Sequence, residues 1–139
     1  MSILEMCDSE AAAVLLVATA EEAIRTMLAR SVGAVAVVDE NQRVAGVFTE
    51  RDVMRRLALS GRDPGKTPVR EIMTTPVEMA TPDTSPGKAL ATMVERHYRH
   101  LPVVDENGRL LGMLSIRNLL EARIDALTRE LDRARSGRS

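Results

Sequence analysis

The sequence predicts an α/β fold, more strictly α+β, in which two copies of one unit pack against each other. The first observation is a repeat: residues 37–43 (VVDENQR) return 66 residues later as residues 103–109 (VVDENGR). The second is that residues 34–53 align without a gap to residues 100–119, with eight identities in twenty positions. The third is that each copy holds both helix-like and strand-like segments. A unit this short cannot bury its apolar faces alone, so a cleft between packed copies is expected.

Composition fits one compact domain made of two half-domains. The chain has 139 residues, of which 45% are apolar, which is enough for a substantial core. Phe48 and Tyr98 are its only aromatic residues, so the core must be aliphatic and rich in methionine. Because bases would find few rings to stack on, a platform for single-stranded nucleic acid is not expected.

The charge pattern excludes several other partners. The formal net charge is −1 with acids and bases interspersed, so no long-range field attracts nucleic acid or anionic lipid. The apolar run at residues 11–20 is too short to span a bilayer, and acidic rather than basic residues precede it. The single Cys7 excludes an internal disulfide framework and suits a reducing compartment, and we interpret it as an incidental thiol near a mobile terminus. We therefore predict a cytoplasmic protein with no membrane partner.

Each copy begins with an amphipathic helix. Residues 21–31 place apolar side chains at helical spacing, and residues 88–96 repeat the pattern. A short apolar run follows each helix, at residues 34–38 and 101–104. These runs predict the first strand of each copy.

A hairpin and a second helix complete each copy. The sequence Asp-Glu-Asn predicts a turn before the second strands, at residues 44–48 and 110–114. Thr49 and Ser115 then stand where a helix N-cap belongs, because a hydroxyl can accept a hydrogen bond from a first-turn amide. Gly, Pro and charged residues at 60–67 predict a loop, and residues 77–80 an extended segment that opens the second copy.

The last helix continues past the point where its twin ends. Leu120, Ile124, Leu127 and Leu131 follow at alternating steps of four and three, and fraying is expected after Ala134. This stripe either lies on its own domain or pairs with another chain, and two heptads leave both interpretations open. The predicted units are residues 1–66, residues 67–122, and a C-terminal extension at 123–139.

Three segments carry a resemblance to a known family: residues 46–52 (GVFTERD), 69–73 (VREIM) and 99–105 (RHLPVVD). They resemble tandem cystathionine-β-synthase (CBS) domains, the Bateman module, over about residues 14–120. The resemblance implies two repeats, each a small mixed sheet with two flanking helices, related by pseudo-twofold symmetry. It also implies a regulatory protein that binds an adenosine nucleotide.

The pair Thr49 and Asp52 suits ribose recognition on physical grounds as well. A carboxylate in the first turn of a helix is held by the helix dipole and can accept hydrogen bonds from both ribose hydroxyls. The alternative is that Thr49 is only an N-cap and Asp52 only a first-turn acid of a capping box, which is common on any helix. The surrounding repeat favours the ribose site.

The resemblance further implies a composite site shared by both repeats. In it, Val77 and Glu78 meet the adenine through main-chain groups, and Val47 flanks the ring. Arg99 and His100 approach the phosphate, a role that suits the planar donor fork of arginine.

The symmetry-related second site departs from this pattern. Ser115 keeps the hydroxyl, but Asn118 replaces the aspartate, so a carboxylate becomes a single amide oxygen. Gly33 and Ala34 stand where the other copy has Arg99 and His100. We therefore expect this site to be degenerate, leaving one competent nucleotide site per chain.

These observations favour a regulatory sensor of AMP or ATP, with ADP, S-adenosylmethionine and NAD as further candidate ligands. The alternative is a ligand-free dimerisation or scaffolding module. An enzyme is not expected, because no arrangement of nucleophile, base and orienting group is visible, and no catalytic cofactor is implied. His97 and His100 lack a third ligand, so no metal site is predicted. The expected partners are a second copy of the chain and an unidentified effector protein. The residues considered for the homodimer contact are Met54, Leu57, Ala58, Leu119 and Leu120.

Overall fold

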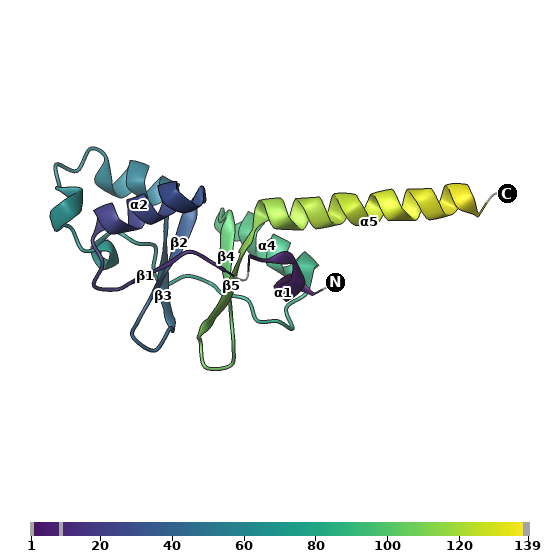
Figure 1. Cartoon of the computed structure of the whole chain (residues 1–139), viewed down its shortest axis with the longest axis horizontal. Coiled ribbons are helices and arrows are strands. Elements are labelled where there is room, and N and C mark those ends of the chain that lie inside the picture. Colours follow the sequence, from purple (N-terminus) through teal and green to yellow (C-terminus); the bar gives the residue numbers. More distant parts are fainter. Residues whose placement is uncertain (1, 9, 138–139) are drawn as a thin grey trace.

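Two small sheets, one from each repeat, lie side by side in the computed structural model, which describes residues 2–8 and 10–137 (Figure 1). The first sheet has the order β1-β2-β3, with β1 parallel to β2 and β3 antiparallel to it. The second is the antiparallel hairpin of β4 and β5, and Ala80 forms a parallel bridge to Val103 where β1 would lie. The strands are β1 (Ala13–Leu15), β2 (Ala34–Val38), β3 (Val44–Thr49), β4 (His100–Val104) and β5 (Leu110–Ser115).

The helices predicted at residues 21–31 and 88–96 are present, with bounds that differ by one or two residues. The α-helices are α1 (Ile3–Met6), α2 (Ala20–Arg30), α3 (Glu50–Asp52), α4 (Pro86–Arg96) and α5 (Ile116–Ser136). A π-helical turn, η1 (Val53–Leu57), continues α3, and two 3-10 turns are η2 (Pro64–Lys66) and η3 (Val69–Glu71). Both α2 and α4 end on a left-handed residue, Ser31 and His97, which lie 66 positions apart. The repeat therefore extends to the conformation of single residues.

The repeated Asp-Glu-Asn sequence builds the two hairpin turns. Asp39 Oδ1 accepts hydrogen bonds from the main-chain N–H groups of Asn41 and Arg43, at 2.8 and 3.0 Å. Asp105 does the same at the equivalent residues, at 2.8 and 2.9 Å. Because each aspartate closes its own turn, these acids are structural and not part of a site.

The two hairpins also join each other directly. The Val44 N–H donates to the Gly108 carbonyl and the Leu110 N–H to the Gln42 carbonyl, both at 3.0 Å. Behind this junction an apolar cluster is shared by both repeats. Its buried members are Ala34, Ala36, Val38, Val47 and Met113, and Val77 packs against them. The halves are thus fixed to one another by main chain and by core.

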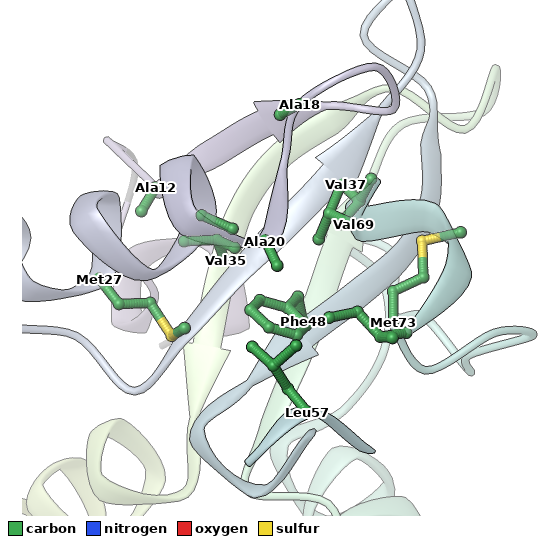
Figure 2. Close-up of a cluster of buried hydrophobic side chains, with 12 residues drawn as sticks. Ala12, Ala18, Ala20, Met27, Val35, Val37, Phe48, Leu57, Val69 and Met73 are labelled. Atoms are coloured by element: carbon green, nitrogen blue, oxygen red, sulfur yellow. The ribbon is translucent and has the colours of Figure 1, made fainter. Parts of the chain in front are cut away.

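Each repeat has its own aliphatic core as well. In the first, Phe48 is fully buried and lies among Val35, Leu57 and Val69 (Figure 2). Leu114 occupies the position equivalent to Phe48 in the second core and is also fully buried. Leu57 and Leu119, which the sequence suggested for a dimer contact, are 5% and 6% exposed and face these cores.

Packing crosses the boundary predicted between residues 66 and 67. Val69 of η3 is buried in the core of the first repeat, whereas Ile3 of α1, 66 positions earlier, is buried in the core of the second. The chain of the first repeat therefore starts beside α4 and α5 and then runs across to β1 (Figure 1). The ranges 1–66 and 67–122 remain predictions of sequence units. In the structure, the segment around Val69 completes the core of the first repeat, and the segment around Ile3 completes the core of the second.

Cys7 lies in this crossing segment and is half-buried. A Cβ atom on Gly112 would come within 2.5 Å of its sulfur, so only glycine fits opposite it. Burial raises the pKa of the Cys7 thiol, which donates to the Leu4 carbonyl at 3.3 Å. Cys7 is therefore a packed side chain, contrary to the expectation of an incidental thiol.

The second helices of the two repeats differ greatly in length. α3 and η1 end at Leu57, whereas α5 runs to Ser136 and projects away from the sheets (Figure 1). The predicted stripe lies on the exposed side of α5, where Leu120, Ile124, Leu127 and Leu131 are 51, 61, 47 and 52% exposed. The helix also continues past Ala134, where fraying was expected. Among the described residues, no helix is long and apolar enough to cross a membrane.

Candidate functional site

A cavity of about 510 Å³ opens where the first repeat meets the helix-to-strand corner of the second. It collects most of the residues that the sequence suggested. The predicted residues on its wall are Val47, Thr49, Asp52, Val77, Arg99 and His100. Glu78 is not on the wall; its carboxylate pairs with Arg96, which is, at 2.5 Å. Thus the predicted residues come together, with Glu78 one layer behind.

The end of β3 forms the base of the cavity. Val47 exchanges two main-chain hydrogen bonds with Thr74, at 2.8 and 3.1 Å, which adds the segment after η3 to the edge of the sheet. Val47 and Val77 then face the cavity as apolar side chains beside this edge. Met54 and Tyr98, which were not among the predicted site residues, also line it. These four side chains form an uncharged part of the wall, against which a planar ring such as a nucleobase could pack.

Asp52 is the most constrained polar residue of the site. Its side chain closes a capping box, because Thr49 Oγ1 accepts from the Asp52 N–H at 3.2 Å and Asp52 Oδ2 accepts from the Thr49 N–H at 3.0 Å. The capping alternative raised by the sequence is therefore present. It does not exhaust the carboxylate, however, since one N–H bond occupies only part of its acceptor capacity.

Thr74 supplies a second set of contacts to the same carboxylate. Its hydroxyl lies 2.9 Å from Asp52 Oδ1 and 3.1 Å from Oδ2, and Arg56 Nε lies 3.7 Å from Oδ1. Asp52 is 5% exposed, so these donors compensate for the burial of its charge. Hydroxyl groups of a bound ligand can take the place of the Thr49 and Thr74 hydroxyls at this acceptor, because both are donors of the same kind. The geometry thus provides a buried anion that already accepts from hydroxyls.

Arginines dominate the charge of the cavity. Its wall includes five of them, Arg51, Arg55, Arg56, Arg96 and Arg99, against the two acids Glu50 and Asp52. Three are held in place: Arg51 donates to the His97 carbonyl at 3.0 Å, Arg56 to the Met73 carbonyl at 2.5 Å, and Arg96 pairs with Glu78. The guanidinium groups of Arg55 and Arg99 make no hydrogen bond or ion pair within residues 2–8 and 10–137. Two guanidinium groups are therefore available to an anion.

His100 adds no charge to this set at neutral pH. Burial lowers the pKa of its imidazole below the ordinary value of 6.5; Glu50 opposes that shift and Arg99 adds to it. The neutral ring packs near Gly33, where an added Cβ would come 3.5 Å from its Cε1 atom. The cavity can therefore bind a phosphate through arginine, with His100 as a neutral hydrogen-bonding neighbour.

At the second site, which the sequence predicts to be degenerate, the helix cap is present and an amide replaces the carboxylate. Ser115 Oγ accepts from the Asn118 N–H at 3.0 Å, and Asn118 Oδ1 accepts from the Ser115 N–H at 2.9 Å. The amide oxygen is thus engaged by the cap, and the rest of the Asn118 side chain is a donor. Met113 pairs with Asp8 as Val47 pairs with Thr74, so an aspartate stands where the first repeat has Thr74.

Several wall residues were missed by sequence reasoning. Arg55 and Arg56 stand three and four positions after Asp52, a spacing that brings side chains to one helix face, so the sequence did contain that signal. Thr74 had no such signal, because its contact with Asp52 spans 22 positions and depends on how η3 packs. Among the described residues, no group of three or more His, Cys, Asp or Glu could hold a metal ion.

Comparison with known proteins identifies the fold and the repeats. The family model described as "CBS domain" matches residues 5–59 and again residues 69–125. The chain belongs to the CBS domain family. This confirms the resemblance and the predicted fold class of two CBS repeats with small mixed sheets and flanking helices.

Relatives of this CBS pair occur in Acidianus ambivalens and in Arabidopsis thaliana. It is 40% identical over 110 residues to a 17.7 kDa protein of Acidianus ambivalens, covering 79% of this chain and 65% of that protein. It is 35% identical over 119 residues to the mitochondrial CBS domain-containing protein CBSX3 of Arabidopsis thaliana, covering 83% and 57%. The chain thus spans about half to two thirds of the length of these curated relatives.

Solved structures include other CBS pairs of similar length. A putative signal-transduction protein with CBS domains from Burkholderia ambifaria has a TM-score of 0.81 and 34% identity, covering 90% of this chain and 95% of that one. CBSX2 in complex with AMP has a TM-score of 0.76 and 21% identity, covering 90% and 97%. At the latter identity the likeness shows the fold alone.

Proposed function

We propose that this CBS pair is a regulatory module that binds one adenosine nucleotide, AMP or ATP, in the cavity between its repeats. The observation that carries the proposal is the carboxylate of Asp52. It is almost fully buried on the wall of a cavity of about 510 Å³, and its present partners include two hydroxyl donors. A ribose presents two hydroxyls at the spacing of a carboxylate's oxygens, so its diol suits this acceptor.

The rest of the wall supports the other parts of the nucleotide. Val47 and Val77 offer an apolar surface for adenine. As the family resemblance implies, main-chain groups of Val77 and Glu78 would meet the edge of the ring. Arg99 and Arg55 are the guanidiniums available to the phosphate. The AMP complex of the fold neighbour CBSX2 agrees with this ligand class. In this proposal the module is not an enzyme, it acts in the cytoplasm, and it changes its own association or that of an effector protein when the nucleotide binds.

A ligand-free dimerisation or scaffolding module is the second candidate. It is favoured by the capping box, which gives Thr49 and Asp52 a structural role without any ligand. It is also favoured by exposed aliphatic side chains at equivalent positions of the two repeats, Met54 at 73% and Leu120 at 51% exposure. Both candidates include a homodimer, so association alone does not separate them.

Nucleotide binding separates them. Mass spectrometry of the small molecules released when the purified protein is denatured identifies a bound ligand, and calorimetry with AMP, ATP and adenosine measures the affinities. The Asp52→Ala variant should bind at least about tenfold more weakly, since a hydrogen bond to a charged group contributes about 1.5 to 3 kcal/mol. Asn118→Ala is the matched control at the equivalent position and should bind as the wild type does. No binding of any adenosine ligand, or equal affinity for wild type and Asp52→Ala, contradicts the proposal.

A further inference from the structure

The apolar stripe of α5 has no cover among the described residues. Leu120, Ile124, Leu127 and Leu131 are all about half exposed, although each is a large aliphatic side chain. The other side of α5 is the one that faces the body: Leu119 is buried, and Ala122 and Ala126 border a groove with Met6 and Pro86. The stripe is therefore on a different side of α5 from the one that packs on the body. The helix itself projects away from the two sheets (Figure 1).

The spacing of the stripe is that of a two-stranded coiled coil. Steps of four, three and four residues keep one seam on a helix that is slightly underwound, and Leu and Ile are the preferred seam residues. Arg117 and Ala134 continue the same seam by one step at either end. A projecting helix of a few turns is marginal in water unless its apolar face packs against a partner. A second α5 is a partner with a matching seam.

Arg117, at one end of the seam, favours one direction of pairing. In a parallel pair each seam residue faces its own copy, so the two Arg117 guanidiniums would meet across the seam. In an antiparallel pair with Leu120 opposite the partner's Leu131, Arg117 instead faces the small Ala134. The same register brings Arg123 beside Glu130 of the partner subunit, twice by symmetry, because these positions flank the seam on the same side. A parallel pair would bring Glu130 beside Arg135 of the partner subunit, so both arrangements gain flanking ion pairs. The repulsion between the two Arg117 guanidiniums in the parallel pair is what favours the antiparallel arrangement.

We propose that α5 pairs antiparallel with α5 of a second copy of this chain, through Leu120, Ile124, Leu127 and Leu131. The pairing is isologous and compatible with a closed dimer on a twofold axis. It requires no nucleotide, so it stands or falls independently of the proposed ligand site.

The first test replaces the centre of the seam. Ile124→Glu with Leu127→Glu in the full chain changes exposed side chains only, so the domain should fold as before, which urea unfolding checks. Sedimentation equilibrium should show self-association weakened by about tenfold or more, since apolar contacts are exchanged for repelling carboxylates. The matched control is Val17→Glu, an aliphatic residue that is 76% exposed in the loop after β1, and it should associate as the wild type does. Unchanged association of the α5 variant overturns the proposal.

The second test reports the direction. Arg123→Glu and Glu130→Arg should each weaken the dimer. The double exchange should restore it, because in the antiparallel pair positions 123 and 130 still carry opposite charges. In a parallel pair Glu130 would instead lie beside Arg135 of the partner subunit, so Glu130→Arg would set two guanidiniums against each other. Association of the double exchange would then stay weak, and that result overturns the antiparallel arrangement.

A crosslink gives an independent answer in Cys7→Ala chains. Leu120→Cys mixed with Leu131→Cys should form a mixed disulfide on oxidation, because the proposed register places these two positions opposite each other. Ready homodisulfides of Leu131→Cys alone would overturn the antiparallel register.

Discussion

The two repeats share their framework and differ in the surroundings of one helix cap. Thr49 with Asp52 and Ser115 with Asn118 form the same capping box at equivalent positions. Around the first, the wall carries Arg55, Arg56 and Arg99, and Thr74 contacts the carboxylate. The equivalent residues around the second are Glu121, Ala122, Gly33 and Asp8. The cap alone therefore says nothing about a ligand; the acceptor and the cations placed beside it do.

The largest effects should come from the cores, where the repeats are alike. Phe48→Ala and Leu114→Ala remove fully buried side chains at equivalent positions. Each should lower the free energy of unfolding by about 2 to 5 kcal/mol, since both leave a cavity. Urea denaturation followed by circular dichroism measures the two losses. A loss confined to one variant would show that the repeats do not contribute equally to a common fold.

The next effect concerns the lost acceptor of the second repeat. Wild-type chain should saturate near one nucleotide, and Asn118→Asp should add a weak second site that binds adenosine before it binds AMP. A carboxylate there regains hydrogen bonds of about 1.5 to 3 kcal/mol to the ribose, but Gly33 still offers the phosphate no cation. Calorimetric stoichiometry with both ligands checks this. Two equal, tight AMP sites in the wild-type chain would contradict the comparison.

Adding Gly33→Arg extends the same experiment to the phosphate. The structure removes one obstacle, because Gly33 has no positive φ, and shows another, because a Cβ there would come within 2.5 Å of Glu50 Oε1. That oxygen ends a flexible side chain on the surface, so Glu50 must rotate away. With both changes, AMP should bind the second site more tightly than adenosine does.

A smaller effect is expected at Thr74 than at the sites above, and a smaller one still at Asp8, the equivalent residue of the other repeat. Thr74→Val keeps the shape of the side chain and removes the hydroxyl that donates to buried Asp52. The free energy of unfolding should fall by about 1.5 to 3 kcal/mol at most, because a charged acceptor loses a donor. Asp8→Ala changes the residue at the equivalent position and should stay within about 0.5 kcal/mol. Equal losses of unfolding free energy in the two variants, measured by denaturant titration, would contradict this difference between the repeats.

The smallest effect is a pH dependence carried by His100, whose counterpart is Ala34. Burial keeps the pKa of His100 below 6.5 in the folded chain. The unfolded chain therefore binds a proton first as the pH falls, so stability is complete above about pH 6.5 and decreases below it. Urea titrations at about pH 7.5 and 5.5 should show a smaller decrease for His100→Asn than for wild type. An identical pH dependence in the two proteins would assign the effect to other groups.

The features that the sequence predicted are local ones. Thr49 and Ser115 could be recognised as caps because the cap depends on residues three positions apart, and the Asp39 and Asp105 turns because an aspartate closes a turn on itself. The repeat then placed both halves in register, which brought Arg99 and His100 to the same cavity as Thr49.

The features that the sequence did not predict depend on packing between distant segments. Residues 5–8 (EMCD) and 71–74 (EIMT) occupy equivalent places, yet they share a single identity, so no repeat was visible there. Their apolar side chains needed only to fill similar spaces in the two cores. Thr74 reaches Asp52, and Ile3 reaches the second core, through that packing alone.

Because the N-terminal segment crosses to the second repeat, the two cores can fold at different times during synthesis. The core of the first repeat is complete once Val69 and Met73 have left the ribosome, because every member of that core precedes them or belongs to their segment. Ile3 precedes every other buried residue that the structure describes, yet its core forms only after Leu101, Leu114 and Leu119 have been added. A contact between residues so far apart in the sequence is slow to form, and the apolar side chain of Ile3 is exposed to solvent until it does. The segment around Ile3 is thus expected to be among the last to pack into a core.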